Sequence, residues 1–341
     1  MNSTLKSNLF ITIILFVFMI GSIVLSFIPG INKLHVLLVL VLSEVLFLIV
    51  PSIIYLIVTK SPVKKTLKLN WPGWLTILLA FLFGLFIQPA MMFLSALTGL
   101  FFPNDVSELI NTLMSTPTLL LVAAVALTPA ICEEIPLRGI LLSGYDQIDI
   151  KKAMLINGLF FAMIHFDFQQ SLYTFVLGAI FAYIVRITNS IIPTMVAHFT
   201  INASQIFLQK LIHYAMQLTP ELNIEAIAQE YSLIEELYAL AGIFVFAVIV
   251  TPVAIIILYG LKGLNKDVHR NNKLIQTDSL TQTNNLTQTN NLVENENIIQ
   301  ADILETTDNN SKIKIFNWPV WLSIVVYFAF TTFLLLLSHV N

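Results

Sequence analysis

Residues 119–142 read LLLVAAVALTPAICEEIPLRGILL, an apolar run that holds two adjacent glutamates and an arginine. A charged side chain in hydrocarbon costs at least ~2.5–3.5 kcal/mol on insertion scales, so such residues are paired, face a cavity or take part in chemistry. Glu134 and Arg138 are four residues apart with the acid first, which favours an ion pair on one helix face. Glu133 points about 100° away from Glu134 on a helix, so it has no partner on its own helix.

The residues next to Glu133 make the backbone irregular. Pro136 has no N–H to donate to the carbonyl of Cys132, and its ring crowds that carbonyl, so the helix should kink beside Glu133. An unpaired carboxylate at a kink in the membrane is the first candidate for a functional group. Cys132 is the one cysteine of the chain, and we interpret it as a small buried apolar residue rather than a nucleophile.

The composition of the chain is that of a membrane protein. Of its 341 residues, 57% are hydrophobic and 11% are charged, and the mean hydropathy is +0.84, whereas about 25% of the residues in a soluble domain are charged. We predict an all-α fold, a polytopic transmembrane helical bundle with about eight or nine membrane helices in the lipid bilayer. The net charge is −3 and no basic block occurs, so no nucleic acid partner is indicated.

Hydropathy divides the chain into consecutive parts. They are N-terminal membrane helices (1–115), a core with the polar motifs (116–209), an external polar segment (210–236), a membrane helix (237–262), a linker (263–316) and a C-terminal membrane helix (317–341). The linker is rich in Asn, Gln and Thr and repeats LTQTNN at 280–285 and 286–291. It has too little apolar surface to offset its ordering entropy, so it is predicted to be a disordered cytoplasmic segment.

The distribution of charge predicts the orientation of the bundle. Residues 101–116 carry two acids and no basic residue, whereas lysines gather in the loops expected at the opposite face: Lys60, Lys64, Lys65, Lys68, Lys151, Lys152, Lys262 and Lys266. The positive-inside rule places such lysine-bearing loops in the cytoplasm. We therefore expect an integral protein of a bacterial cell membrane with a cytoplasmic N-terminus and a site that opens towards the cytoplasm.

Two further features of the apolar segments need an explanation. The runs 153–166 and 172–185 are shorter than the ~20 residues of a full span, so we expect them to tilt, to extend past their ends or to form a partial hairpin. Glu44 is a second intramembrane acid with no partner nearby in sequence. We favour a structural contact with another helix as its role.

Three polar residues in the later apolar runs complete a candidate site. At ~1.5 Å per residue, His165, His198 and Asn202 fall in the same layer as Glu133 when each is measured from the expected cytoplasmic end of its helix. A carboxylate and an imidazole can jointly deprotonate a water molecule, and a second imidazole with a carboxamide can stabilise an oxyanion. Taken singly, an intramembrane His or Asn as often only hydrogen-bonds a neighbouring helix.

These residues form motifs that resemble those of a known family. The patterns EExxxR at 133–138, FxxxH at 161–165 and HxxxN at 198–202 are similar, in this order, to the three motifs of the CPBP intramembrane proteases. That family includes the type II CAAX prenyl endopeptidases and the bacteriocin-processing group, also called the Abi domain. The resemblance covers about residues 116–209. This chain departs from the family pattern at two positions: Leu137 stands where an aromatic residue often precedes the arginine, and Pro136 is less usual at its position.

The resemblance implies an intramembrane endopeptidase acting on a peptide or protein substrate in the membrane. It implies that Glu133 and His165 activate water, that His198 and Asn202 stabilise the oxyanion, and that the Glu–Arg pair four residues apart holds the site together. The implied substrate is a prenylated CAAX-type C-terminus or a bacterial peptide or membrane precursor.

No cofactor is predicted, and zinc is the less favoured alternative to a metal-free site. Catalytic zinc commonly takes three protein ligands and keeps an open position. Glu133, His165 and His198 are the candidate ligands, but using both histidines would leave Asn202 alone on the oxyanion unless the metal polarised the carbonyl itself. The chain also lacks the HExxH spacing that places two imidazoles on one helix face.

Two functions of other classes remain open. A non-catalytic membrane protein, with an immunity or scaffold role, could retain these helices, but it would be free to lose His165 or Asn202. A transporter also uses intramembrane acids, but it would more often show inverted repeats with paired broken helices. Here the sequence repeats only an NWPxW helix start, at 70–74 and 317–321, and both copies run the same way.

Overall fold

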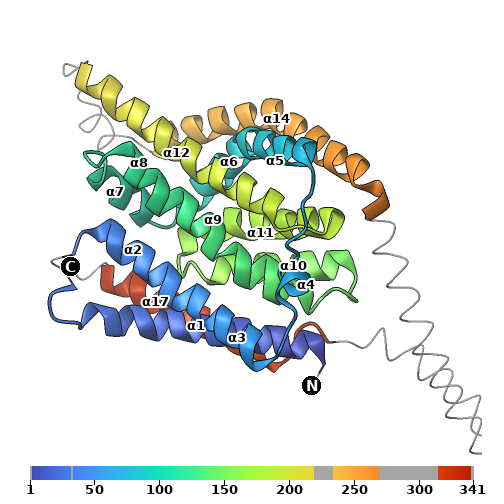
Figure 1. Cartoon of the computed structure of the whole chain (residues 1–341). Helices are drawn as coiled ribbons and strands as arrows, with labels where there is room; N and C mark the ends of the chain where they lie inside the picture. The colour runs from blue at the N-terminus through green and yellow to red at the C-terminus, as the bar shows by residue number, and fades with distance from the viewer. Residues whose placement is uncertain (1, 32–33, 219–232, 269–313, 339–341) are drawn as a thin grey trace, which may run out of the picture.

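The computed structural model describes residues 2–31, 34–218, 233–268 and 314–338. Its regular elements are all helical: α1 (Ser3–Ser26), α2 (Val36–Glu44), η2 (Val45–Ile49), α3 (Val50–Val58), α4 (Val63–Thr66), α5 (Trp74–Phe86), α6 (Gln88–Gly99), α7 (Asp105–Thr112), α8 (Thr118–Val122), η3 (Ala123–Leu127), α9 (Thr128–Cys132), η4 (Ile135–Leu141), α10 (Ile150–Met163), α11 (Phe168–Thr188), α12 (Ile192–Leu218), α14 (Leu233–Leu264) and α17 (Trp318–Ser338). The elements labelled η are π-helical turns. The chain folds as an all-α bundle (Figure 1).

Seven stretches within the described residues are long and apolar enough to cross a membrane. They are Ser3–Ser26, Val36–Val58, Trp74–Gly99, Thr118–Leu141, Phe168–Thr188, Ile234–Leu264 and Trp318–Leu337. The polytopic transmembrane bundle expected from composition is confirmed. Helices α10 and α12 form where the sequence predicts apolar segments, but neither is among these seven. Residues 269–313 of the linker predicted at 263–316, which include the repeat at 280–291, lie outside the described residues.

The two short apolar runs form a helical hairpin. Helix α10 has 14 residues and α11 has 21, and the two pack along one another. The crossing is close because a glycine from each helix lies at it: a Cβ atom added to Gly178 would be 2.8 Å from the Cα atom of Gly158. Small residues allow such close approach of membrane helices. Of the alternatives predicted, the run at 172–185 extends past its ends to form α11, which is long enough to cross a membrane, and the shorter α10 packs along it as a hairpin.

Helix α17 packs against α1 although the two are at opposite ends of the sequence (Figure 1). Polar side chains of the two helices form hydrogen bonds along this contact. Asn8 donates to the carbonyl of Ile315 (3.2 Å), and the hydroxyl of Thr12 lies 2.8 Å from that of Ser323. Tyr145, which follows η4, donates from its hydroxyl to the side-chain oxygen of Asn8 (2.8 Å). Interhelical hydrogen bonds of this kind stabilise helix contacts in a membrane, where water cannot compete.

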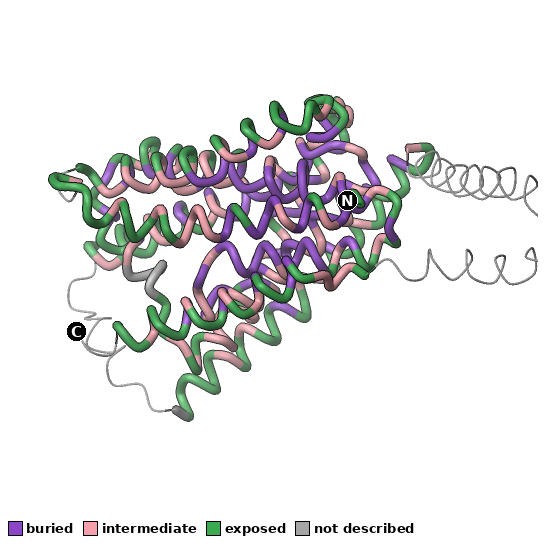
Figure 2. The backbone as a smooth tube through the Cα atoms, turned by 90° about the horizontal axis from the view of Figure 1, so that it is seen from below, coloured by how far each residue is buried: buried purple, intermediate pink, exposed green. Residues whose placement is uncertain are grey.

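The bundle has two different ends. One, which we call the lysine-bearing end, comprises residues 59–73, 142–149, 189–191 and 262–268, and the N-terminus lies near it (Figure 1). The other, the far end, comprises residues 100–117 and the end of α12. Buried backbone runs through the middle of the bundle, and the outer helices are mostly exposed (Figure 2). Large apolar side chains such as Ile57 and Val58 on that outer surface are suited to contact lipid.

Candidate active site

Two prolines interrupt the regular helical hydrogen bonding around Glu133. Helix α9 ends at Cys132, and the π-helical turn η4 begins at Ile135, so the irregularity expected at Pro136 is present. Pro129 likewise follows a π-helical turn, η3, and has no N–H to donate to the carbonyl of Val125. π-Helical turns within α-helices are frequent at functional sites. Here they present Glu133 at the point where the helical hydrogen-bond ladder is interrupted.

Glu134 and Arg138 form the ion pair that their spacing predicts. Arg138 Nη1 lies 3.2 Å from Glu134 Oε1, and both side chains are fully buried. The guanidinium also lies over the ring of Phe161, 4.1 Å from its centroid, and near the ring of Phe181, 5.2 Å away. A buried cation gains from such aromatic faces because the rings are negative on their faces. Arg138 therefore belongs to the packed core and not to an open cavity.

Glu134 has a second partner, which sequence reasoning missed. Nδ1 of His198 lies 3.1 Å from Glu134 Oε1, and its Nε2 lies 3.8 Å from Glu133 Oε2. A carboxylate paired with an arginine can only accept a hydrogen bond, so the Nδ1–H of His198 donates to Glu134. This leaves Nε2 on the side of Glu133. The contact was not predictable from spacing because residues 134 and 198 come from helices whose packing the sequence does not specify.

His165 lies just after α10, at the turn of the hairpin, and is partly exposed. Its Nδ1 is 2.7 Å from the carbonyl oxygen of Phe161. A carbonyl can only accept, so Nδ1 carries the hydrogen and Nε2 of the neutral ring is left as an acceptor. This tautomer leaves the acceptor nitrogen of His165 available for a ligand.

Asn202 donates a hydrogen bond to the carbonyl of Val125, which Pro129 cannot pair with because proline has no N–H. Its Nδ2 donates to the carbonyl oxygen of Val125 at 3.3 Å, the group that would bond the N–H of residue 129 if that residue were not proline. The carboxamide has two N–H bonds, so one donor remains for a ligand. The interrupted helix thus positions the side chain of Asn202.

All four predicted catalytic residues line one cavity of about 540 Å³: Glu133, His165, His198 and Asn202. Its wall is otherwise apolar or uncharged, with thioether, amide and hydroxyl groups from α6, α11 and α12, for example Met91, Gln169, Tyr173, Thr174 and Gln209. A largely apolar cavity with a few converging polar groups is the usual form of a ligand site. Glu134 and Arg138 are not in this wall.

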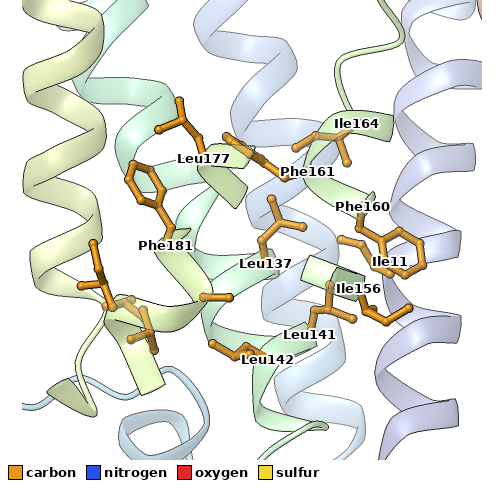
Figure 3. Packing of buried hydrophobic residues seen from close by; sticks show 14 of the residues in the cluster. Ile11, Leu137, Leu141, Leu142, Ile156, Phe160, Phe161, Ile164, Leu177 and Phe181 are labelled. Atoms are coloured by element: carbon orange, nitrogen blue, oxygen red, sulfur yellow. The ribbon is translucent and has the colours of Figure 1, made fainter. Parts of the chain in front are cut away.

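The cavity wall lies away from the lysine-bearing end, where the sequence analysis expected the site to open. The cavity wall includes Gly99, Asn104, Gln205 and Leu208, which are exposed and lie towards the far end. Towards the lysine-bearing end lies a packed apolar cluster in which Leu137, Leu141 and other side chains are fully buried (Figure 3). The charge count could not predict this because it orients loops and says nothing of the packing between helices.

Glu44 ends α2, which packs on α9 and η3. A contact of the Glu44 side chain with another helix stays a prediction, and its Oε2 is buried without a hydrogen-bond partner among the described residues. Glu44 is not in the cavity wall.

Phe166, next to His165, is a second feature that the sequence did not indicate. Its φ is +47°, in the left-handed region where a bulky residue is rare. The ring is held between Phe18 of α1, at 6.4 Å, and Phe330 of α17, at 5.2 Å between centroids. Tyr327 of α17 also donates to the carbonyl of Asp167 at 3.3 Å. Aromatic residues of α1 and α17 thus surround the turn that carries His165.

The donor set does not suit a zinc ion. Within the described residues, no three His, Cys, Asp or Glu side chains are arranged to hold a metal. Catalytic zinc commonly needs three such ligands. Glu133, His165 and His198 share the cavity, but they do not form that arrangement.

The comparison with known proteins agrees with the motif positions. Residues 115–204 match the family model described as Type II CAAX prenyl endopeptidase Rce1-like. No curated protein and no solved structure matches the chain. The matched stretch contains the three motifs and nearly coincides with the core predicted at 116–209. Over residues 115–204 the chain is therefore similar to the type II CAAX prenyl endopeptidases of the Rce1-like family.

Proposed function

We propose that this protein is an intramembrane endopeptidase that hydrolyses a peptide bond in the cavity described above. The observation that supports this most strongly is that four polar side chains from three separate helical segments line one otherwise apolar cavity. Groups that only hydrogen-bonded neighbouring helices would have no reason to share a cavity wall. The alternatives, a non-catalytic scaffold or immunity protein and a transporter, lack a specific observation in their favour.

Glu133 and His165 would activate the attacking water. The carboxylate of Glu133 takes a proton from the water while Nε2 of His165 accepts its other hydrogen bond. The hydroxide oxygen forms a bond to the carbonyl carbon, and the carbonyl electron pair moves to its oxygen. When the intermediate collapses, the C–N bond breaks, and Glu133 returns the proton to the leaving amine. Glu133 thus acts first as base and then as acid.

His198 and Asn202 would stabilise the negative oxygen of the intermediate. Asn202 has one N–H beyond its bond to Val125, and His198 needs a proton on Nε2 to donate to the oxyanion. Such donors are worth about 2.7–4 kcal/mol each when they are fixed in place. Glu134 fixes His198 through Nδ1, and Arg138 fixes Glu134. The buried ion pair therefore acts on catalysis through the orientation of His198.

The reaction as drawn needs no metal ion. Each of the four cavity residues has a role in it, and the donor set fits zinc poorly. The uncharged cavity wall suits a peptide backbone, because amide side chains can both donate to it and accept from it. The substrate classes consistent with this wall are a prenylated CAAX-type C-terminus and a peptide or membrane precursor.

The test is cleavage of a mixture of internally quenched peptides by the purified protein in nanodiscs. We expect the wild-type protein to cleave, and Glu133→Ala and His165→Ala to abolish cleavage while both variants still accumulate in the membrane. Unimpaired cleavage by either variant would contradict the mechanism. A wild-type protein without any cleavage would favour the non-catalytic alternatives.

A further inference from the structure

The cavity wall is distributed unevenly along the helices that form it. In α6 the wall residues run from Met91 to Gly99, in the half of the Trp74–Gly99 span remote from the lysine-bearing end. In α11, which starts away from that end, they run from Gln169 to Phe181. In α12 they run from His198 to Gln209. The cavity therefore extends from the candidate catalytic residues to the far end.

The lysine-bearing end is closed by hydrogen bonds between its loops. Nζ of Lys68, itself buried, lies 2.6 Å from Asp146 Oδ1. Arg186 donates to the carbonyl of Tyr145 at 2.7 Å, and Asn70 donates to that of Asn189 at 2.8 Å. These bonds join three loops over the packed cluster shown in Figure 3. No wall residue of the cavity comes from them among the described residues.

The charge of the two ends identifies the face of the membrane on which each lies. The described cations at the lysine-bearing end are Lys6, Lys60, Lys64, Lys65, Lys68, Lys151, Lys152, Arg186, Lys262, Lys266 and Lys314. At the far end the described part of the chain has Lys210, which donates to the carbonyls of Met114 and Thr116. By the positive-inside rule the lysine-bearing end is cytoplasmic. The mouth of the cavity is then on the non-cytoplasmic face.

We infer that the substrate is an extended peptide segment that enters from the non-cytoplasmic face, such as an exported peptide or the outward-facing part of a membrane protein. This rests on the function proposed above. Along α12, Gln209 is about 16 Å from His198 at ~1.5 Å per residue, which is room for about five extended residues at ~3.3 Å each. Oε1 of Gln209 is buried without a partner in the described structure, so it can accept a backbone N–H of that segment. A prenylated C-terminus made in the cytoplasm would meet the closed end.

Two glycines provide a matched pair for testing the sidedness. Gly99 is at the cavity mouth and Gly263 is at the lysine-bearing end; both are exposed, and a Cβ atom added to either meets nothing within 4 Å. Gly99→Cys and Gly263→Cys are made in a Cys132→Ala background and treated in intact cells with a membrane-impermeant maleimide. We expect Gly99→Cys to be labelled in intact cells, and Gly263→Cys to be labelled only after lysis. Labelling of Gly99→Cys only after lysis would overturn the inference.

The second readout is cleavage of the quenched peptide mixture after labelling. A bulky maleimide at Gly99→Cys should lower the cleavage rate at least tenfold, whereas the same reagent at Gly263→Cys should change it less than twofold. Equal loss from both positions would overturn entry at the far end. If the unlabelled protein cleaves nothing, the proposed function fails, while the labelling result still reports on which face the cavity opens.

Discussion

Glu133 and Glu134 are adjacent in sequence but belong to different regions of the molecule. Glu133 is part of the cavity wall, together with partly exposed residues such as His165 and Asn202. Glu134 lies in the packed core, where it and Arg138 are fully buried. The cavity holds polar groups that a ligand can reach, and the core holds charges that only other protein groups compensate. Substitutions in the two regions should therefore fail in different ways, through lost activity in the cavity and through lost stability in the core.

The largest effect is expected in the core, from Arg138→Ala. It strands the buried carboxylate of Glu134, and breaking a buried pair from one side costs about 3–5 kcal/mol. The amount of folded protein and its thermal stability in detergent should both fall, together with activity. The double variant Glu134→Gln/Arg138→Met removes both charges and should regain much of the stability. Normal thermal stability of Arg138→Ala with activity lost would instead make Arg138 a direct substrate contact.

In the cavity, Asn202→Ala should lower the rate and not the stability, by less than the complete loss of cleavage expected for Glu133→Ala or His165→Ala. Loss of one oxyanion donor lowers kcat by about 100- to 1,000-fold. The variant also leaves the carbonyl of Val125 without its donor, but the site is partly exposed, so we expect thermal stability to change little. Steady-state cleavage of the quenched peptides measures kcat and KM. A fall in folded protein as large as that of Arg138→Ala would place Asn202 with the core.

A smaller effect is expected from α17, at the border of the two regions. Phe330→Ala removes a ring that holds Phe166 beside His165. A displaced catalytic group lowers the rate, with losses up to ~100-fold for a shift of about 1 Å; we expect about tenfold in kcat and little change in KM. Phe333→Ala, on the lipid-exposed side of α17, is the control and should be near wild type.

The same turn allows a test of backbone strain. Both Phe166→Gly and Phe166→Ala remove the ring. Glycine adopts the positive φ of residue 166 without steric strain, whereas alanine keeps the conformational strain that a Cβ atom causes there. Combined with Phe330→Ala, the glycine variant should therefore be more active than the alanine variant. Equal rates of cleavage by the two double variants would show that the conformation of residue 166 does not set the position of His165.

The smallest effect is expected from removing metal ions. Exhaustive chelation of the purified protein should change the cleavage rate less than twofold, because the cavity residues suffice for the reaction as drawn and fit zinc poorly. Elemental analysis of the same sample is the control. Stoichiometric zinc, with activity lost on its removal and restored on its return, would contradict the metal-free mechanism.

Contacts between residues close in sequence could be predicted from their spacing. Contacts between distant segments could not, because they depend on how the helices pack. The pair of Glu134 and Arg138 follows from helical periodicity alone, and the irregular turn follows from Pro136. The contact of Glu134 with His198 depends on how two distant helices pack. The left-handed φ of Phe166 leaves no pattern in the sequence, since glycine is the usual residue there.

The orientation of the site shows the same limit. Lysines identify one end of the bundle from sequence alone, but whether the cavity opens there depends on where apolar side chains fill the space between helices. Leu137 and Leu141 fill it towards the lysine-bearing end. Similarly, the docking of α17 on α1 depends on single polar side chains such as Asn8 and Thr12, which have no distinctive pattern in an apolar helix.

The most direct test of joint water activation by Glu133 and His165 is a double-mutant comparison of peptide cleavage. Values of kcat/KM are measured for Glu133→Gln, His165→Gln and the double variant at equal amounts of folded protein. Residues that act as one unit have strongly non-additive effects. We predict that each single variant loses at least ~100-fold, within the usual contribution of acid–base catalysis, and that the double variant is no slower than the slower single one. Losses that multiply, or a single variant with wild-type kcat/KM, would contradict the account.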